Sequence, residues 1–194
     1  MKTIYNIYVE STPNPEVMKF VSNQLLIDTD LEINSKEEAQ NISIANALFD
    51  FPFVKKIFIN SNFISITKNK NSEWDDIAMP LRVFISDLLN EEGIQFSNLN
   101  HSKQQKEKTI IKNKASKFTS LEKEIDKILT EYIKPAVESD GGSIILDSCK
   151  DGIVYLILKG SCDGCPSATI TLKQGIERLL KEKLGNQIKE VCAS

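Results

Sequence analysis

Two cysteines, Cys162 and Cys165, stand two residues apart in the stretch "GSCDGCPS", residues 160–167. Thiols at this spacing can bind a metal ion, hold an iron–sulfur cluster, or form and break a disulfide. The stretch follows an apolar run typical of a strand and precedes a run of helical periodicity, and Pro166 suits the first position of a helix. We therefore expect the pair in a strand-to-helix turn, where the free N–H groups of the helix favour a thiolate.

A metal or cluster at this pair needs further ligands, because structural zinc ions and iron–sulfur clusters take four in all. The chain has four cysteines and one histidine, His101, which lies in a polar segment. Cys149 is expected at the far end of the neighbouring strand, roughly 20 Å away, and so cannot share a metal with Cys162 in one domain. That argument does not exclude Cys192. The two missing ligands indicate a second copy of the same pair.

Three chemistries remain open from the residues alone. Four cysteines are too few for a disulfide framework in 194 residues, so the pair is metal-binding or redox-active. A cluster carrier, a thiol–disulfide oxidoreductase and a zinc-stapled interaction module would all use it. Against the oxidoreductase, no β-α-β pattern is recognisable around the pair, and the proline follows the pair instead of lying inside it. Against zinc, the single histidine supports no Cys/His site.

The bulk composition is that of a globular protein with room for two small domains, with 41% hydrophobic and 26% charged residues. No apolar run approaches the length of about eighteen residues needed to span a membrane, which predicts no membrane partner. The N-terminal "MKTIYNIYVE" lacks the marks of a signal or transit peptide. These features predict a cytoplasmic protein with reduced thiols.

The net charge of −3 is distributed unevenly: −6 over residues 1–100, +5 over 101–117 and −2 over 118–194. The basic segment has no aromatic interleaving and no nucleic-acid motif, so no nucleic-acid partner is expected. It also holds too little apolar surface to offset the entropy of ordering it. The sequence thus predicts a flexible basic linker over residues 98–118 between a domain at 1–97 and a domain at 119–194.

The predicted elements make both domains α+β. In the first domain we expect strands at 3–10 and 17–27, a helix from Ser35 to Phe49, a hairpin of 54–60 and 63–69, and an amphipathic helix from Trp74 to about Gly93 that is kinked or starts late at Pro80.

The second domain follows an α-β-β-α-β order. The pattern predicts a helix with its apolar face over 121–136, a stop at "SDGG" (139–142), strands at 143–149 and 152–160, a helix from the cysteine pair to Gly185, and a last strand at 187–192. The glycines of the stop are expected in the left-handed conformation. The strand "GIVYLILKG" is apolar on both faces, which predicts burial on both faces.

The segments "IKPAVESDGG" and "DGIVYLILKGSCDGCPSATITLKQGIERLL" together closely resemble the C-terminal domain of NifU-like (Nfu) iron–sulfur proteins. This resemblance covers about residues 121–192 and is specific, since the helix, the DGG turn, the hairpin and the C-x-x-C-P loop occur in order. Most of residues 1–95 is similar to the Nfu N-terminal domain, through "TPNPEVMKFV" (12–21), "ANALFDFPFVKKIFI" and "NFISITK", with Trp74 behind them. The order matches full-length Nfu proteins, without a mitochondrial leader.

The resemblance implies a scaffold or carrier for iron–sulfur cluster assembly that is not an enzyme and has no catalytic residues. In that family the cysteine pairs of two subunits bridge one 4Fe–4S cluster, which is passed to apo-proteins. Carried over, Cys162 and Cys165 are the metal and cluster ligands of a homodimer, with a 2Fe–2S cluster as the second option. The implied partners are apo iron–sulfur proteins and upstream cluster assembly proteins. Cys149 and Cys192 lie outside the motif and receive no role.

Overall fold

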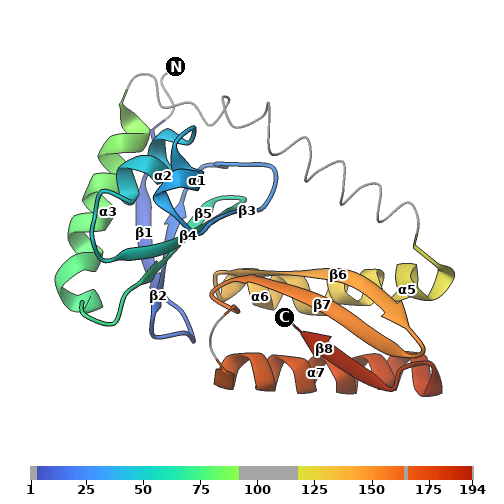
Figure 1. The fold of residues 1–194 in the computed structure, drawn as a ribbon. Coiled ribbons are helices and arrows are strands. Elements are labelled where there is room, and N and C mark those ends of the chain that lie inside the picture. The colour runs from blue at the N-terminus through green and yellow to red at the C-terminus, as the bar shows by residue number, and fades with distance from the viewer. Residues whose placement is uncertain (1–3, 92–117, 164–165, 194) are drawn as a thin grey trace. The chain divides into compact units, whose positions relative to one another are not determined.

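The computed structural model describes residues 4–91, 118–163 and 166–193. The chain divides into two compact units, Met1–Lys108 and Thr109–Ser194, and each has its own sheet (Figure 1). Each unit also has its own hydrophobic core. This confirms the α+β class with two domains. Residues 98–117 of the predicted linker lie outside the described residues. No helix in the described parts of the chain is long and apolar enough to cross a membrane.

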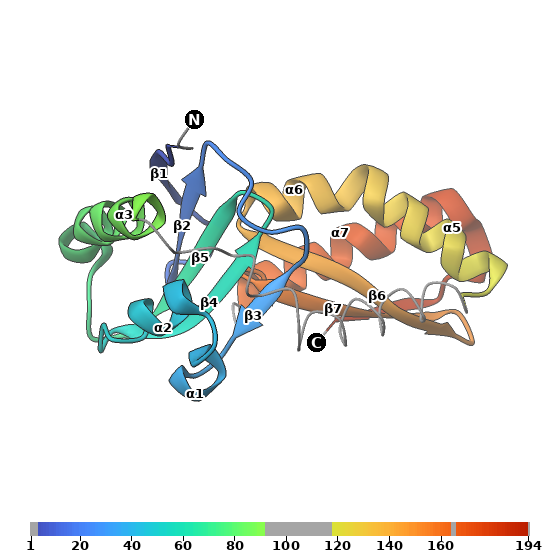
Figure 2. The ribbon, with the colours of Figure 1, turned by 90° about the horizontal axis from the view of Figure 1, so that it is seen from above.

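The first unit is a five-stranded antiparallel sheet in the order β1-β2-β5-β4-β3. Its strands are β1 (Ile7–Ser11), β2 (Val17–Ser22), β3 (Leu31–Ile33), β4 (Val54–Asn60) and β5 (Phe63–Lys68). Three helices, α1 (Lys36–Ala39), α2 (Ser43–Leu48) and α3 (Trp74–Asn90), lie on one face of this sheet (Figures 1 and 2). Alternate strand residues such as Phe20, Ile57 and Ile64 point to that face and form the core.

The hairpin predicted in this unit is confirmed, with Ser61 at φ 48° in its tight turn. The single helix predicted from Ser35 to Phe49 is wrong, because the structure has two short helices there. Ser35 does cap the first, accepting a hydrogen bond from the N–H of Glu38. The strand predicted over 17–27 ends early at Ser22, whose Oγ accepts from the N–H of Gln24 and turns the backbone locally.

The long helix of the first unit, α3, begins at Trp74 and runs through Pro80 to Asn90. Of the two alternatives predicted at Pro80, a kink or a late start, the late start is therefore wrong. The predicted end at Gly93 lies outside the described residues. The short edge strand β3 was not predicted, since three residues are too few to show a period.

The second unit has the predicted α-β-β-α-β order. A continuous helical stretch consists of α5 (Ser120–Ile128), the π-helix η2 (Leu129–Ile133) and α6 (Lys134–Ser139), and is followed by β6 (Gly142–Lys150), β7 (Ile153–Gly160), α7 (Pro166–Leu184), the 3₁₀ turn η3 (Gly185–Gln187) and β8 (Glu190–Ala193). The sheet order is β6-β7-β8, with β6 and β7 antiparallel and β7 and β8 parallel. The first helix was predicted correctly except for its π-helical segment η2. Pro135 explains this segment, because it lacks the N–H that would bond to the carbonyl of Glu131.

The burial predicted for both faces of β7 is wrong. The helices of this unit cover one face of the sheet (Figures 1 and 2). Val154, Leu156 and Leu158, which alternate along β7, are in the core. On the other face Tyr155 is 38% exposed and Ile157 37% exposed. An apolar pattern on both faces of a strand shows that both can be covered, but in this unit the helices cover only one.

Candidate functional site

Cys162 lies in the connection between β7, which ends at Gly160, and α7, which begins at Pro166. The predicted strand-to-helix turn is therefore confirmed for this cysteine, whereas Cys165 lies outside the described residues. Cys162 is only 8% exposed and belongs to the hydrophobic core of the second unit. Although Cys162 stands in a loop, its side chain therefore packs in the core.

Backbone contacts fix the first half of this loop to the turn that follows α6. The N–H of Ser161 donates to the carbonyl of Gly141 at 3.2 Å, and its Oγ donates to the carbonyl of Asp140. Gly141 at φ 80° and Gly160 at φ 67° adopt the left-handed conformation that these two reversals need. The "DGG" turn and the cysteine loop thus form one hydrogen-bonded structure at the same end of the sheet.

The left-handed conformation expected for the glycines of the stop is found at Gly141 and is wrong for Gly142, whose requirement is space. Gly142 pairs with Gly160 across the hairpin. A Cβ atom at position 142 would lie 2.6 Å from Sγ of Cys162 and 2.8 Å from the carbonyl oxygen of Lys159. The sulfur therefore sits in a hollow that only glycine leaves open. Sequence reasoning missed this contact, since the only available signal was the second glycine of the turn.

The other two cysteines are distant from this hollow. Cys149 pairs with Val154 near the opposite end of the hairpin, which confirms the separation expected from strand length. Cys192 pairs with Tyr155 on the far side of β7. Five strand positions separate Tyr155 from Gly160, roughly 16 Å at the usual rise. The parallel pairing of β8 thus excludes Cys192 as a ligand in the same domain, a question that the sequence had left open.

The surroundings of Cys149 also disfavour a thiolate. Burial raises the pKa of the Cys149 thiol, and the nearby Glu122 carboxylate raises it further. Glu122 is itself held in place, since its Oε1 accepts from the backbone N–H of Cys149 at 2.8 Å and its Oε2 from the N–H of Thr119 at 2.9 Å. The hydrogen bond between Glu122 and Cys149 thus connects α5 to β6, and Cys149 has a structural role.

The cysteine pair does lie in a β-α-β unit, made of β7, α7 and the parallel strand β8. One of our two arguments against a thiol–disulfide oxidoreductase is therefore wrong, and only the position of the proline remains. Within the described residues no group of three or more His, Cys, Asp or Glu is placed to hold a metal ion. Cys165 lies outside the residues to which that finding applies.

The "TPNP" segment of the first unit has a structural role. The Oγ of Thr12 donates to the carbonyls of Asn14 and Val17, and Asn14 is buried. The indole N–H of Trp74 donates to the carbonyl of Pro15 at 3.1 Å. These bonds attach the turn between β1 and β2 to the start of α3.

Two protein-family models match the chain and together cover most of it. Residues 7–92 match the model described as scaffold protein Nfu/NifU N terminal, and residues 125–192 match the model described as NifU-like domain.

Curated relatives match over 90% of this chain. The mitochondrial NFU1 iron–sulfur cluster scaffold homologs of Homo sapiens and Drosophila grimshawi are each 30% identical over 177 residues. The mitochondrial NifU-like protein 5 of Arabidopsis thaliana is 30% identical over 179 residues. The match spans 66%, 57% and 62% of the length of these three relatives, respectively.

Two solved structures resemble parts of the chain. The solution structure of a NifU-like protein from Saccharomyces cerevisiae is 22% identical, with a TM-score of 0.40 over 44% of this chain and 79% of that one. The crystal structure of a Staphylococcus aureus protein is 23% identical, with a TM-score of 0.35 over 42% of this chain and 96% of that one.

The expectation of a cytoplasmic protein is wrong. All three curated relatives named above are mitochondrial proteins by name, which points away from the cytoplasm. Residues 7–10 of the N-terminal stretch "MKTIYNIYVE" belong to the edge strand β1. A strand of the fold carries no information about the compartment.

Proposed function

Because the chain belongs to the NifU-like Nfu family of scaffold proteins, we propose that it holds an iron–sulfur cluster as cargo and passes it to apo-proteins. It does so without catalytic turnover. Cys162 and Cys165 are the ligands, and the cluster is bridged between two copies of the chain. The cluster is of the 4Fe–4S type, with 2Fe–2S as the second option. Upstream assembly proteins supply it, and apo iron–sulfur proteins receive it.

The observation that carries this proposal is the space that Gly142, which has no Cβ, leaves for the sulfur of Cys162. The sulfur lies at the strand-to-helix connection, fixed by a hydrogen-bonded turn on one side and by the core on the other. Such fixing lowers the entropic cost of binding, because the thiol is held in position before a cluster arrives. A ligand held in this way fits a rigid cluster with defined sulfur positions.

The ligand count supports sharing between two chains. A cluster needs about four thiolates, and each chain offers one pair once the strand register removes Cys149 and Cys192. Asp163, next to Cys162, is exposed, so the loop reaches the surface directly after the buried sulfur. A cluster at a junction of two such loops is open to attack by the thiolates of a recipient. Exchange of one thiolate for another then moves the cluster without any change in its oxidation state.

Anaerobic reconstitution with iron and sulfide tests the proposal. The wild-type chain should turn brown and hold about two iron atoms per chain. Cys162→Ser and Cys165→Ser should each lose the colour and the iron. Cys149→Ser and Cys192→Ser are the matched controls, since each removes one thiol far from the hollow. Equal iron and sulfide contents in all four variants would contradict the assignment of the ligands.

A thiol–disulfide oxidoreductase is the second candidate, because the pair lies in a β-α-β unit. The same variants separate it from the carrier. An oxidoreductase stays colourless after reconstitution and reduces a test disulfide in a reaction that both Cys162 and Cys165 support. A zinc module also stays colourless, and it releases zinc when acid protonates the thiolates.

A further inference from the structure

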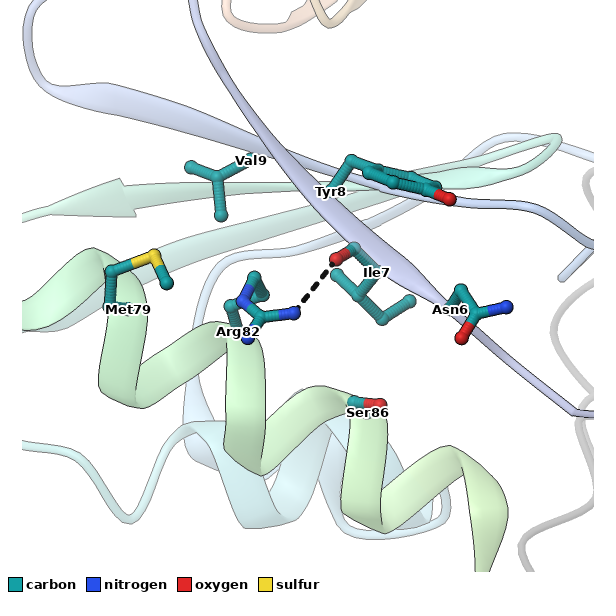
Figure 3. A pocket seen from close by; sticks show the side chains of 7 residues that line it. All are labelled: Asn6, Ile7, Tyr8, Val9, Met79, Arg82 and Ser86. Carbon is teal, nitrogen blue, oxygen red and sulfur yellow. Dashed lines mark hydrogen bonds between the residues drawn. The ribbon is translucent and has the colours of Figure 1, made fainter.

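The first unit contains a second feature, a cleft of about 360 Å³ between the edge strand β1 and helix α3. Figure 3 shows Ile7 and Val9 on the strand and Met79, Arg82 and Ser86 on the helix around this cleft. The cleft belongs to a different domain from the cysteine pair. Its walls combine an edge strand, a cationic group and exposed apolar side chains.

Side chains of α3 cover the free edge of β1 at Ile7 and of the segment just before the strand at Tyr5. Asn90 bonds to both backbone groups of Tyr5, accepting from its N–H at 3.0 Å and donating to its carbonyl at 2.9 Å. Ser86 donates to the same carbonyl at 3.4 Å, and Arg82 donates to the carbonyl of Ile7 at 3.3 Å (Figure 3). These three helix residues are four positions apart and so share one face of α3. They take the place of a neighbouring strand.

This protection of the edge ends before Val9. Alternate residues of a strand direct their backbone groups to the same edge, so Val9 presents its N–H and C=O on the side where Ile7 bonds to Arg82. None of the hydrogen bonds between α3 and β1 in the described part of the unit reaches Val9. The next position of the stripe on α3 is Ala78, which has no polar side-chain atom. The backbone of Val9 is therefore available to another strand.

Arg82 has unused donor capacity at the same place. Its Nε is buried without a hydrogen-bond partner, and Arg82 forms no ion pair within the described residues. A guanidinium has five N–H donors, and its planar fork matches a carboxylate. Met79, three positions earlier on the helix, also lines the cleft and is 56% exposed, and its unbranched side chain can adapt to a ligand there.

We propose that this cleft binds an extended segment of a partner protein that carries an acidic side chain. The segment adds to the sheet beside Val9 through backbone hydrogen bonds, which is how exposed sheet edges bind peptides. Its carboxylate accepts from Arg82, which satisfies the unpartnered Nε. Its apolar side chains contact Met79 and Tyr8, which is 60% exposed. Charge complementarity selects this occupant, because a neutral or basic segment would leave the guanidinium unpaired.

Two short synthetic peptides with blocked ends test the proposal on the isotope-labelled full-length chain. Their sequences are Thr-Val-Glu-Val-Thr and Thr-Val-Gln-Val-Thr, which differ only in the charge at the centre. The NMR signals of the Val9 amide and the Arg82 Nε–H report binding. The acidic peptide should shift both signals, and the neutral peptide should bind about tenfold more weakly. Arg82→Gln should remove that difference, and Arg82→Lys should retain only part of it.

Arg178→Gln is the matched control, since Arg178 is the other arginine of the chain and lies exposed on α7. It should bind both peptides as the wild type does. Equal binding of the two peptides, or no shift with either, would overturn the proposal. A shift of Val9 that depends on protein concentration without peptide would also overturn it, by showing that a second copy of the chain occupies the edge. The amide spectrum of Arg82→Gln away from the cleft confirms that the variant is folded.

Discussion

Gly142 packs directly against Cys162, so closely that a Cβ atom on the glycine would lie 2.6 Å from the cysteine sulfur. The same Cβ would lie 2.8 Å from the carbonyl oxygen of Lys159, which is backbone and cannot move aside cheaply. The turn after α6 and the cysteine loop are thus fitted to each other. The position of the sulfur depends on the smallest residue of a different element.

Gly142→Ala should displace the sulfur of Cys162 and reduce cluster loading. The added methyl group overfills the hollow, which costs about 1–3 kcal/mol of stability. Iron per chain after anaerobic reconstitution and the urea midpoint of the β6 and β7 amide signals measure the two effects. Gly175→Ala in α7 is the control, because nothing lies within 4 Å of a Cβ there. It should load normally and be stabilised by about 0.5–1 kcal/mol. Normal loading by Gly142→Ala would show that the hollow does not position a ligand.

Glu122→Gln should destabilise the second domain in a pH-dependent way. Burial alone would raise the pKa of Glu122, but hydrogen bonds from Thr119 and Cys149, together with Lys150, outweigh it and lower that pKa below the ordinary 4.5. The ionised carboxylate therefore adds stability that is fully present above pH 4.5 and is lost as the pH falls through the lower folded-state pKa. At neutral pH the variant should be less stable by about 1–2 kcal/mol.

Urea unfolding of the two proteins between acidic and neutral pH, followed through the amide signals of β6, measures this difference. The difference in the free energy of unfolding between the two proteins should narrow as the pH falls below 4.5, the ordinary pKa of a glutamate. Glu124→Gln changes an exposed carboxylate on the same helix and should match the wild type throughout. If the free energies of unfolding of the wild type and Glu122→Gln differ by the same amount across the pH range, the role of the ionised carboxylate is refuted.

Cluster loading should drive association of the chain. In the proposed arrangement each copy supplies Cys162 and Cys165, so a cluster that needs about four thiolates joins two copies. The apo protein should sediment as a monomer and the reconstituted protein as a dimer that holds one cluster. Analytical ultracentrifugation with iron counted per chain is the direct measurement. A monomer that holds about four iron atoms per chain would rule out the bridged cluster.

Residues 118–194 should fold and load a cluster on their own. This unit has its own hydrophobic core, and Phe118 at its start packs against that core. The amide spectrum of the fragment should overlay that of the second domain in the full chain, and its iron content should be the same. An insoluble fragment, or one that takes up no iron, would place part of the core or of the site in residues 1–117.

The sequence by itself determined the features that depend on neighbouring residues. The cysteine loop between a strand and a helix, the hairpin of β4 and β5 and the helix stop at the DGG turn follow from short-range periodicity and from the backbone properties of glycine and proline. The motif around Cys162 also predicted the family correctly. These signals are local, because the residues that encode each element lie within it or directly beside it in the sequence.

Only the tertiary structure decided what depends on segments far apart in the chain. The parallel pairing of β8 with β7 places Cys192 beside Tyr155 and away from the cysteine loop. The layer of helices covers one face of that sheet and leaves Ile157 exposed on the other. The contact between Gly142 and Cys162 joins residues twenty positions apart. None of these has a periodic signature, because strand order and packing are set by the total surface that the elements bury together, which no single segment encodes.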